Sequence, residues 1–338
     1  MIFIIILAVF LSSYLGGFIL CQYAERLNLI QVPNHRSSHQ QPTPHGGGLA
    51  IVISFLAVSS WLLWQQALDY SLFLIVTALA LMIALISLLD DLFYISRFIR
   101  ISIHLTASLI LILGLSNLAL YSELNFFSLP FWLIAAGFVF ISTWWINLFN
   151  FMDGIDGIAA TQAIFMLLAA AGLSFVINSE IYQETLWLWM LYLVAAIAGF
   201  LILNWSPAKL FMGDVGSTFI AFMLVFFTLS SIYLNWLNYA VWGILAALFV
   251  TDASFTLIRR IITRQAWREA HCSHAYQRLA QHWQSHQKVT LLYLGINLFW
   301  LLPLAYLALQ PTQNANLYLM IAYSPLIISL FILNKVLK

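Results

Sequence analysis

Long apolar runs, separated by short polar segments, cover almost the whole of the 338-residue chain. A helix needs about 20 apolar residues to cross a bilayer. The runs are continuous rather than alternating, so they indicate membrane-spanning helices and not the strands of a barrel. We therefore predict an all-α fold, a polytopic membrane helical bundle. Its eleven spans are expected at about residues 1–21, 47–66, 72–91, 101–121, 128–149, 158–178, 186–204, 217–235, 238–258, 289–309 and 315–334.

Basic residues are confined to alternate connections between these spans or to their edges. They are Arg26, Arg36, Arg97, Arg100, Lys209, Arg259, Arg260, Arg264, Arg268, Arg278, Lys288, Lys335 and Lys338. Because loops rich in Lys and Arg stay on the cytoplasmic side, we place the N-terminus outside and the C-terminus in the cytoplasm. The first span has no basic residue before it, so we expect it to be retained rather than removed as a signal peptide.

Composition narrows the class of protein further. Only 7% of the residues are charged and 63% are hydrophobic, against roughly 25% charged in a soluble domain. The net charge of +1 gives no general attraction for nucleic acid, and Cys21 and Cys272 have no metal-ligand spacing. We find no repeat and no soluble domain, so residues 1–338 are interpreted as one integral-membrane domain. Its cytoplasmic loops are expected at about 22–46, 92–100, 150–157, 205–216 and 259–288.

Two adjacent carboxylates, Asp90 and Asp91, end the third predicted span. They repel each other and the negative end of the helix dipole, so their position costs stability and indicates a function such as general base catalysis. Arg97 and Arg100 open the next span. Together the four side chains form a carboxylate and guanidinium cluster that suits a phosphate group. The alternative is an ordinary solvated helix end.

A second polar segment, Asn147–Gly157, ends the fifth span. Asn147 and Asn150 are neighbours on the last helical turn, and Asp153 and Asp156 continue the same spacing. A glycine after each aspartate lets the backbone approach a ligand. Carboxylate and amide oxygens are the ligands that Mg²⁺ prefers. A plain turn between spans is the alternative.

Three more polar segments lie on the same predicted side of the membrane. Asp214 lies in a glycine-rich turn into the eighth span, where it either caps the helix or belongs to an anion site. His45 can reach anions, and we expect the three glycines after it to expose their backbone N–H groups; a plain turn is the alternative. His271 and His274 lie in the largest loop, together with Arg278. Zinc is one interpretation of these histidines, and contact with a sugar or a phosphate is the better one.

Two polar residues inside the predicted spans are weaker candidates. Asp252 lies near the cytoplasmic end of the ninth span. It is either a functional acid or a structural partner of Arg259 or Arg260. His104 is interpreted as an interior histidine whose hydrogen bonds are satisfied.

Taken together, the polar segments resemble those of the polyprenyl-phosphate N-acetylhexosamine-1-phosphate transferases, a glycosyltransferase family (family 4) that includes the MraY-like and WecA-like enzymes. The similar segments occur in family order across about residues 33–278. They are the Pro-Thr-Pro-His-Gly-Gly-Gly run at 42–48, Asp90-Asp91, the Asn-x-x-Asn-x-x-Asp-Gly-x-Asp-Gly run at 147–157, Phe-Met-Gly-Asp-Val-Gly-Ser at 211–217 and His-x-x-His at 271–274. The last segment is most similar to the WbpL-type branch.

The resemblance implies transfer of a HexNAc 1-phosphate from UDP-HexNAc to a polyprenyl phosphate, which is undecaprenyl phosphate in bacteria, with release of UMP. It further implies a multi-pass protein of the bacterial inner membrane with a cytoplasmic active site, beginning the synthesis of O-antigen lipopolysaccharide or another cell-envelope polysaccharide. Mg²⁺ is the implied cofactor, with Mn²⁺ as an alternative. The partners are therefore UDP-HexNAc, polyprenyl phosphate and membrane lipid, and no nucleic acid.

The same resemblance implies roles for individual residues. Asn150 and Asp214 would hold the metal ion, and Asp90, Asp91, Arg100 and Asp214 would form the catalytic set, with Asp90 or Asp91 as the base. The implied substrate-binding residues are Asn147, Asp153, Asp156, His45, Arg97, His271, His274 and Arg278. His45, Arg97 and Arg100 differ from the residues common in the family, which leaves the preferred sugar and acceptor open.

Two other classes of function remain open from the sequence. A polytopic transporter usually keeps its substrate and ion site near the middle of the bilayer, where this chain has no clear ionisable residue. A lipid-phosphate phosphatase would release phosphate without transferring a sugar. The oligomeric state, including a homodimer, is also open.

Overall fold

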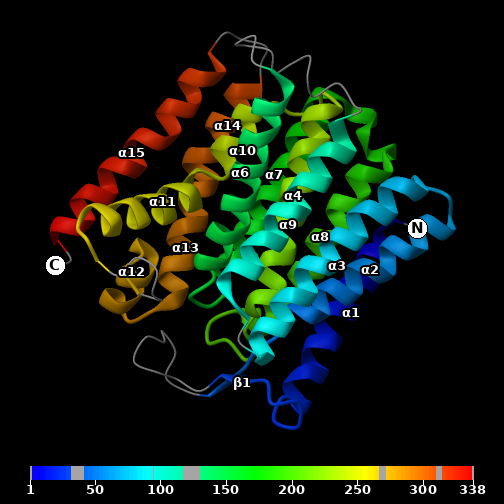
Figure 1. Ribbon diagram of the computed structural model, residues 1–338, viewed down its shortest axis with the longest axis horizontal. Helices are drawn as coiled ribbons and strands as arrows, with labels where there is room; N and C mark the ends of the chain where they lie inside the picture. Colours follow the sequence, from blue (N-terminus) through cyan, green and yellow to red (C-terminus); the bar gives the residue numbers. More distant parts are fainter. Residues whose placement is uncertain are drawn as a thin grey trace.

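The computed structural model describes residues 2–31, 42–93, 95–116, 130–265, 272–309 and 314–336. Its helices pack side by side in one bundle, with the N-terminal helices on the right of Figure 1 and the C-terminal ones on the left. They are α1 (Ile2–Tyr23), α2 (Gly48–Trp64), α3 (Tyr70–Phe93), α4 (Arg97–Ser116), α6 (Phe131–Phe151), α7 (Ile158–Ile177), α8 (Thr185–Asn204), α9 (Gly213–Tyr233), α10 (Tyr239–Leu245), α11 (Ala247–Ile262), α12 (Ala275–Trp283), α13 (His286–Ile296), α14 (Leu302–Leu309) and α15 (Ala315–Val336).

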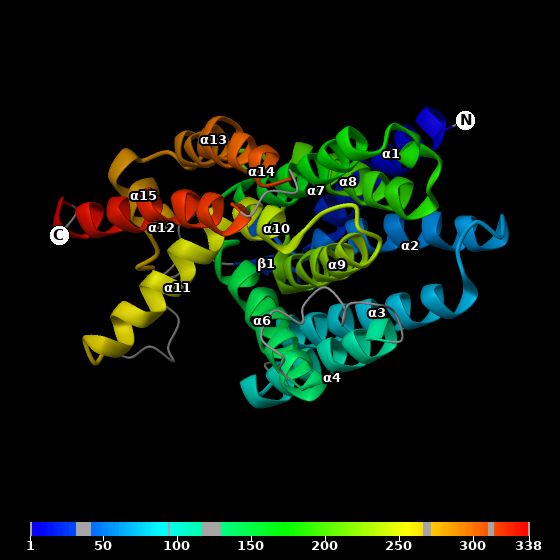
Figure 2. The same ribbon diagram turned by 90° about the horizontal axis from the view of Figure 1, so that it is seen from above.

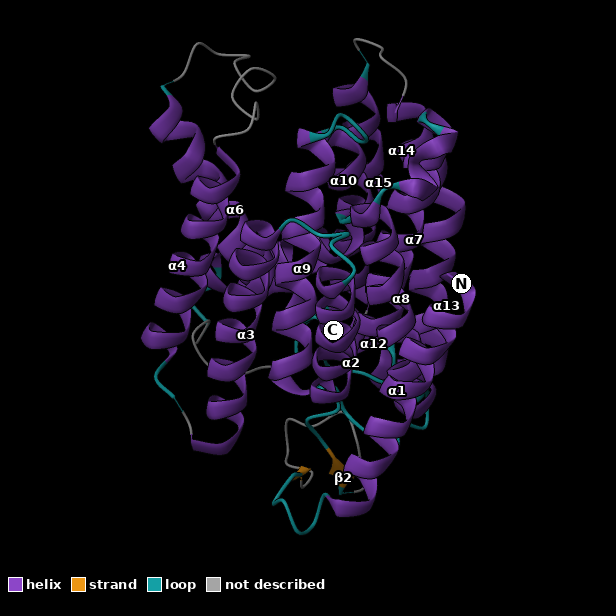
Figure 3. Cartoon of the chain, turned by 90° about the vertical axis from the view of Figure 1, so that its right-hand side faces the viewer, coloured by secondary structure: helices purple, strands orange, loops and turns teal. Residues whose placement is uncertain are grey.

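Short irregular elements complete the described chain. A 3₁₀ helix, Ser179–Gln183, precedes α8, and a π-helical segment, Asn297–Leu301, joins α13 to α14. Two strands, β1 (Ile30–Gln31) and β2 (Thr43–Pro44), pair antiparallel. Figure 3 shows this ladder at one end of the bundle. It fixes the entry of the chain into α2.

The all-α prediction is confirmed, because each of the eleven predicted spans contains a helix. Among the described residues, nine helices are long and apolar enough to cross a membrane. A bent pair, α10 with α11, would be a tenth, and α2 is an apolar helix of 17 residues. The number of spans and their orientation stay predictions.

Helix α9 forms the centre of the bundle. It packs against α2, α3 and α6, and its residues from Val215 to Ile232 are almost all buried. Trp189 of α8 stacks on Phe55 of α2 at 5.6 Å between ring centroids, and Phe55 meets Phe219 of α9 edge-on at 5.9 Å. Buried aromatic pairs of this kind hold helices in fixed positions. The first turn of α9 is therefore rigidly placed.

The starts of α2 and α9 touch backbone to backbone. A Cβ atom built on Gly48 would overlap the Cα of Gly216. The N–H groups of Gly47 and Gly48 donate to the carbonyls of Phe211 and Met212 at 2.9 and 2.8 Å. The expectation that this glycine run exposes its N–H groups is therefore wrong for these two residues. Their hydrogen bonds hold α2 against the turn that carries Asp214.

Helix α11 departs from α10 by 68°, and Figure 2 shows it pointing away from the bundle beside α15. Its buried Asp252 accepts hydrogen bonds from the N–H groups of Ala275 and Tyr276 at 2.8 and 3.0 Å, and from the hydroxyl of Tyr293 at 2.8 Å. Asp252 thus receives the N-terminus of α12 and pairs with His274, not with Arg259 or Arg260. Its role in the structure is to hold α12 under α11.

Candidate active site

Four helix ends bring their polar side chains to one place. Asp90 ends α3, Arg100 lies in the first turn of α4, Asn150 ends α6 and Asp214 begins α9. Nη1 of Arg100 forms ion pairs with Oδ2 of Asp90 and, at 3.0 Å, with Oδ2 of Asp214. Nδ2 of Asn150 donates to Oδ1 of Asp214 at 2.9 Å. The predicted convergence of these residues is confirmed, and we call the four side chains the acid–arginine cluster.

The cluster is accessible without being fully solvated. The exposed fractions of the side chains of Asp90, Arg100 and Asp214 are 16%, 21% and 32%. Partial burial strengthens the attraction between Arg100 and the carboxylates, because less water screens it. A phosphate that entered here would meet a guanidinium already held in position.

The two adjacent acids have different surroundings. Asp90 uses both oxygens, one with Arg100 and the other as acceptor from the Ile95 N–H at 2.7 Å. Oδ2 of Asp91 is buried and has no hydrogen-bond partner in the described part of the chain. It faces the start of α9, where a Cβ atom built on Gly213 would lie 3.2 Å away. Asp91 therefore has the uncommitted carboxylate oxygen of the pair.

Hydrogen bonds behind the cluster fix the first turn of α9. Gly213 has a φ of +74°, in the left-handed region that favours glycine. The hydroxyl of Thr218 donates to the carbonyl of Asp214 at 2.7 Å and lies 2.9 Å from the hydroxyl of Ser87 on α3. The hydroxyl of Ser217 accepts from Asn150 Nδ2 at 2.9 Å. Asp214 is thus held from three helices.

Asn147 lies one turn before Asn150 but contacts a different neighbour. Its amide nitrogen donates to the Thr143 carbonyl at 2.8 Å and lies 3.3 Å from Nδ1 of His104 on α4. Nε2 of His104 is buried and has no partner among the described residues. The interpretation of His104 as a fully satisfied histidine is therefore wrong for one ring nitrogen. His104 follows Arg100 by four residues, so the two side chains lie on the same face of α4. This spacing could have predicted that His104 lies near the cluster.

Asp156 is buried in the turn between α6 and α7 and is held as a carboxylate. It pairs with Nδ1 of His286 at 3.1 Å and accepts from the Ala208 N–H at 3.2 Å. Burial raises its pKa, but the hydrogen bond and charge of His286, with hydrogen bonds from Ser206 and Ala208, outweigh burial and leave the pKa below its usual value. His286 is 130 residues away in the sequence, so no local spacing predicted this pair.

Asp153 lies between Asp156 and the cluster and has the opposite character. Burial, together with the charges of Asp214 and Asp156, raises its pKa to about 7. His45 also lies within the field of Asp214. Burial lowers the pKa of His45, although the charge of Asp214 opposes that shift. Asp153 is therefore a group near the cluster that can change its protonation near neutral pH.

The remaining predicted substrate-binding residues are more dispersed. Arg97 is exposed at the first residue of α4. His274 lies 3.6 Å from Asp252, and Arg278 donates to Oδ1 of Asn334 on α15. His271 lies outside the described residues, as does most of the polar segment before His45.

Tyr276 contacts the site, although no sequence pattern pointed to it. Its buried hydroxyl donates to the Phe151 carbonyl at 2.9 Å, directly after Asn150. A Cβ atom built on Gly154 would overlap this hydroxyl. Burial, with the charges of Asp252 and Asp153, raises the pKa of Tyr276 well above its usual value, so it stays a donor. The residue therefore positions the turn that carries Asp153.

The oxygens around Asp214 suit a hard divalent cation. Asp214 and Asp91 supply carboxylate oxygens, and Oδ2 of Asp91, which has no partner in the described residues, could bind a cation. Asn150 adds an amide group, whose nitrogen donates to Asp214 in this structure. Within the described ranges, no three His, Cys, Asp or Glu side chains are grouped as a metal site. Mg²⁺ commonly binds through one or two carboxylates and completes its coordination with water and substrate phosphates. The donor set fits that pattern.

Comparison with known proteins gives a family and several relatives. The family model described as glycosyl transferase family 4 matches residues 73–232, a little under half of the chain. This region contains Asp90, Arg100, Asn150 and Asp214. The match confirms the family resemblance predicted from the motifs, while the WbpL-type branch stays a prediction.

The relatives are similar at the level of 28% identity. A probable undecaprenyl-phosphate N-acetylglucosaminyl 1-phosphate transferase of Bacillus subtilis aligns over 86% of this chain and 81% of its own length. An undecaprenyl-phosphate alpha-N-acetylglucosaminyl 1-phosphate transferase of Escherichia coli K12 aligns over 67% and 61%. A phospho-N-acetylmuramoyl-pentapeptide-transferase of Streptococcus sanguinis aligns over 59% and 62%. The chain thus matches less than two thirds of the last two proteins.

Proposed function

We propose, from the family 4 match over residues 73–232, that this protein transfers an N-acetylhexosamine 1-phosphate from a UDP-linked donor to a polyprenyl phosphate. The names of the relatives support undecaprenyl phosphate as the acceptor. The observation that carries the proposal is the acid–arginine cluster, in which Arg100 bridges Asp90 and Asp214 and Asn150 holds Asp214.

In the proposed reaction, an oxygen of the lipid phosphate attacks the β-phosphorus of the donor. A new P–O bond forms to the acceptor, the bond between the two donor phosphates breaks, and UMP leaves with the bond electrons. Positioning and electrostatic stabilisation supply most of the catalysis in phosphoryl transfer. Arg100 would bind a phosphate oxygen, because a guanidinium makes strong charge-assisted hydrogen bonds to phosphate. The products are a polyprenyl-diphospho-HexNAc and UMP.

Asp91 is the better candidate for the base that takes a proton from the lipid phosphate. Asp90 already accepts from Arg100 and Ile95, whereas Oδ2 of Asp91 has no partner in the described residues. Asn150 and Asp214 would hold Mg²⁺, with Mn²⁺ as an alternative, and the ion would neutralise charge on the donor diphosphate. Asp153 and His45 lie within the field of Asp214, and together with Asp156 they would bind the rest of the donor.

The setting proposed for this reaction is the cytoplasmic face of a bacterial inner membrane, at the start of O-antigen or other cell-envelope polysaccharide synthesis. The donor would arrive from the cytosol and the acceptor from the bilayer. A cluster built from helix ends, rather than from mid-helix residues, suits that meeting.

The test is a transfer assay with the purified full chain. Undecaprenyl phosphate is offered with UDP-GlcNAc, UDP-GalNAc, UDP-FucNAc or UDP-QuiNAc, with Mg²⁺, Mn²⁺ or neither, and the lipid product is identified by mass. We expect UMP release that requires both substrates and a divalent cation. Free phosphate without a sugar-bearing lipid would indicate a phosphatase, and no reaction with any donor would leave the transporter as the better proposal.

The variant Asp214→Asn tests the role of the cluster with a substitution of nearly the same size. We expect a loss of transfer of about 100-fold or more, the size typical of removing one electrostatic contributor. Asp69→Asn is the matched control, because Asp69 also begins a helix and accepts from the Leu72 N–H at 2.8 Å, but at the opposite end of α3. Near-normal turnover by Asp214→Asn would remove this residue from the proposed site.

A further inference from the structure

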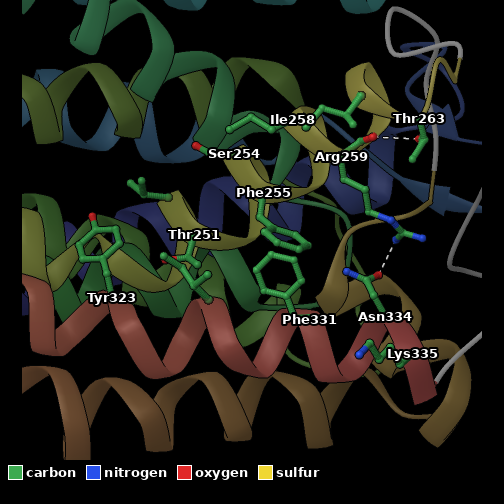
Figure 4. A pocket seen from close by; sticks show the side chains of 13 residues that line it. Thr251, Ser254, Phe255, Ile258, Arg259, Thr263, Tyr323, Phe331, Asn334 and Lys335 are labelled. Atoms are coloured by element: carbon green, nitrogen blue, oxygen red, sulfur yellow. Dashed lines mark hydrogen bonds between the residues drawn. The ribbon is translucent and has the colours of Figure 1, made fainter.

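A cavity lies between α11 and α15, outside the acid–arginine cluster. It has a volume of about 590 Å³, and Figure 4 shows the side chains that line it. Its walls are mostly apolar, with Val250, Phe255 and Ile258 from α11 and Ile327 and Phe331 from α15. The 68° bend before α11 turns this helix away from the direction of α10. We call the cavity the α11–α15 groove.

The shape of the groove suits a hydrocarbon chain. Its lining residues on and just after α11 run from Val250 to Thr263, which at 1.5 Å per residue corresponds to about 20 Å. One leaflet of a bilayer contributes about 15 Å of hydrocarbon. A single lipid tail could therefore lie along the groove. Phe255 and Phe331 meet edge-on at 4.8 Å between centroids and support its wall.

One end of the groove is basic. Arg259 and Lys335 line it there, and Arg278 of α12 reaches the same place. Arg259 and Arg278 both donate to a single neutral acceptor, Oδ1 of Asn334. No Asp or Glu occurs among the described residues that line the groove. Burial and the neighbouring charge of Arg259 lower the pKa of Arg278, although the charge of Asp252 opposes that shift.

Apolar walls that end in clustered cations match the two parts of an anionic lipid. Guanidinium groups bind phosphate oxygens through charge-assisted hydrogen bonds, and basic pockets between helices bind anionic headgroups. We propose that the α11–α15 groove binds one anionic phospholipid, with a tail along Phe255 and Phe331 and its phosphate at Arg259 and Lys335. This proposal goes beyond the transfer reaction and does not depend on it.

A lipid in this groove would be linked to the rest of the fold through α11. Asp252 of this helix holds the start of α12, and Tyr276 of α12 holds the turn after Asn150. An occupied groove would thus hold α11 against α15. Helix α15 itself carries no residue of the acid–arginine cluster. We expect bound lipid to raise the thermal stability of the protein by mass action.

The experiment is native mass spectrometry of the full chain in detergent, with phosphatidylglycerol or phosphatidylcholine added at equal concentration. We expect one retained phosphatidylglycerol, about tenfold in excess over phosphatidylcholine. Arg259→Gln with Lys335→Gln should abolish this preference, and the single variant Lys335→Gln, at an exposed position, should weaken it. Ile327→Trp should reduce retention of both lipids by filling the groove without changing its charge.

Arg264→Asn is the matched control. Arg264 is exposed just beyond α11 and has a φ of +54°, which asparagine tolerates. It lies outside the lining of the groove, so its removal should keep the preference for phosphatidylglycerol.

Equal retention of phosphatidylcholine, an unchanged preference in the double variant or an equal loss in the control would overturn the proposal. Displacement of phosphatidylglycerol by undecaprenyl phosphate, or a dimer mass that depends on Ile327, would assign the groove to the acceptor or to a second copy instead.

Discussion

Asp153 and Asp156 lie three residues apart in the turn between α6 and α7, yet their pKa values are shifted in opposite directions. Asp156 has His286 and the Ala208 N–H as partners, which favour its charged form. Asp153 has no such partner in the described residues, and the charges of Asp214 and Asp156 add to the effect of burial. The same residue type therefore serves as a fixed anion at one position and as a titratable group at the other.

Asp153 should make the stability of the protein fall as pH rises. An unfolded chain loses this proton near pH 3.8, whereas the folded protein keeps it to about pH 7. Between these values the folded state binds more protons, so the free energy of unfolding decreases with increasing pH. Asp153→Asn should flatten that slope, as measured by thermal unfolding in detergent without divalent cations.

The control for this measurement is Asp69→Asn, which changes an exposed aspartate at the other end of α3. It should leave the pH dependence as in the unsubstituted protein. A slope in Asp153→Asn as steep as in the control would show that Asp153 is already ionised in the folded state.

At the scale of elements, the glycines of α2 and α9 set how closely two helices approach. The contact of Gly48 with Gly216 lets the N–H groups of Gly47 and Gly48 reach the carbonyls before α9. Small residues allow this kind of close helix packing in membrane proteins. The glycines of this segment are therefore used for packing, which places Asp214 against α3 and α6.

Gly48→Ala should destabilise the protein by at least about 2 kcal/mol, because the added methyl group meets backbone atoms of Gly216 that cannot move aside. Gly172→Ala is the matched control, since a Cβ atom there meets nothing within 4 Å in helix α7. It should gain about 0.5–1 kcal/mol from helix propensity. Thermal unfolding of both variants tests the pair, and equal stability would contradict the packing argument.

Helices were predictable from the sequence because each must present about 20 apolar residues to lipid. The break at Ala246 was not predictable, because the predicted 238–258 run is apolar through the bend. Only the contacts in the folded protein reveal the bend. There the carbonyl of Leu245 accepts from Gln162 on α7 at 3.1 Å. Long-range pairs such as Asp252 with His274 could not be predicted either, because no local spacing relates one residue to the other.

At the scale of the whole molecule, alternation of helix direction explains the acid–arginine cluster. Asp90 and Asn150 end helices, while Arg100 and Asp214 begin them, so an up-and-down bundle brings all four to the same end. Sequence analysis could predict this gathering from the span count alone. It could not predict that Asp90 is committed to Arg100 while Asp91 is not, because that distinction depends on atomic contacts.

The same alternation makes the membrane orientation testable. Glu180 lies between α7 and α8, at the end opposite to the cluster, and Gln265 follows α11 at the cluster's end; both are exposed. In a background of Cys21→Ser and Cys272→Ser, intact cells treated with a membrane-impermeant maleimide should label Glu180→Cys. Gln265→Cys should react only after the membrane is disrupted, because the positive-inside rule places the basic loops in the cytoplasm. The reverse pattern would put the acid–arginine cluster outside the cell, away from a cytosolic UDP-sugar, and would contradict the proposed site of transfer.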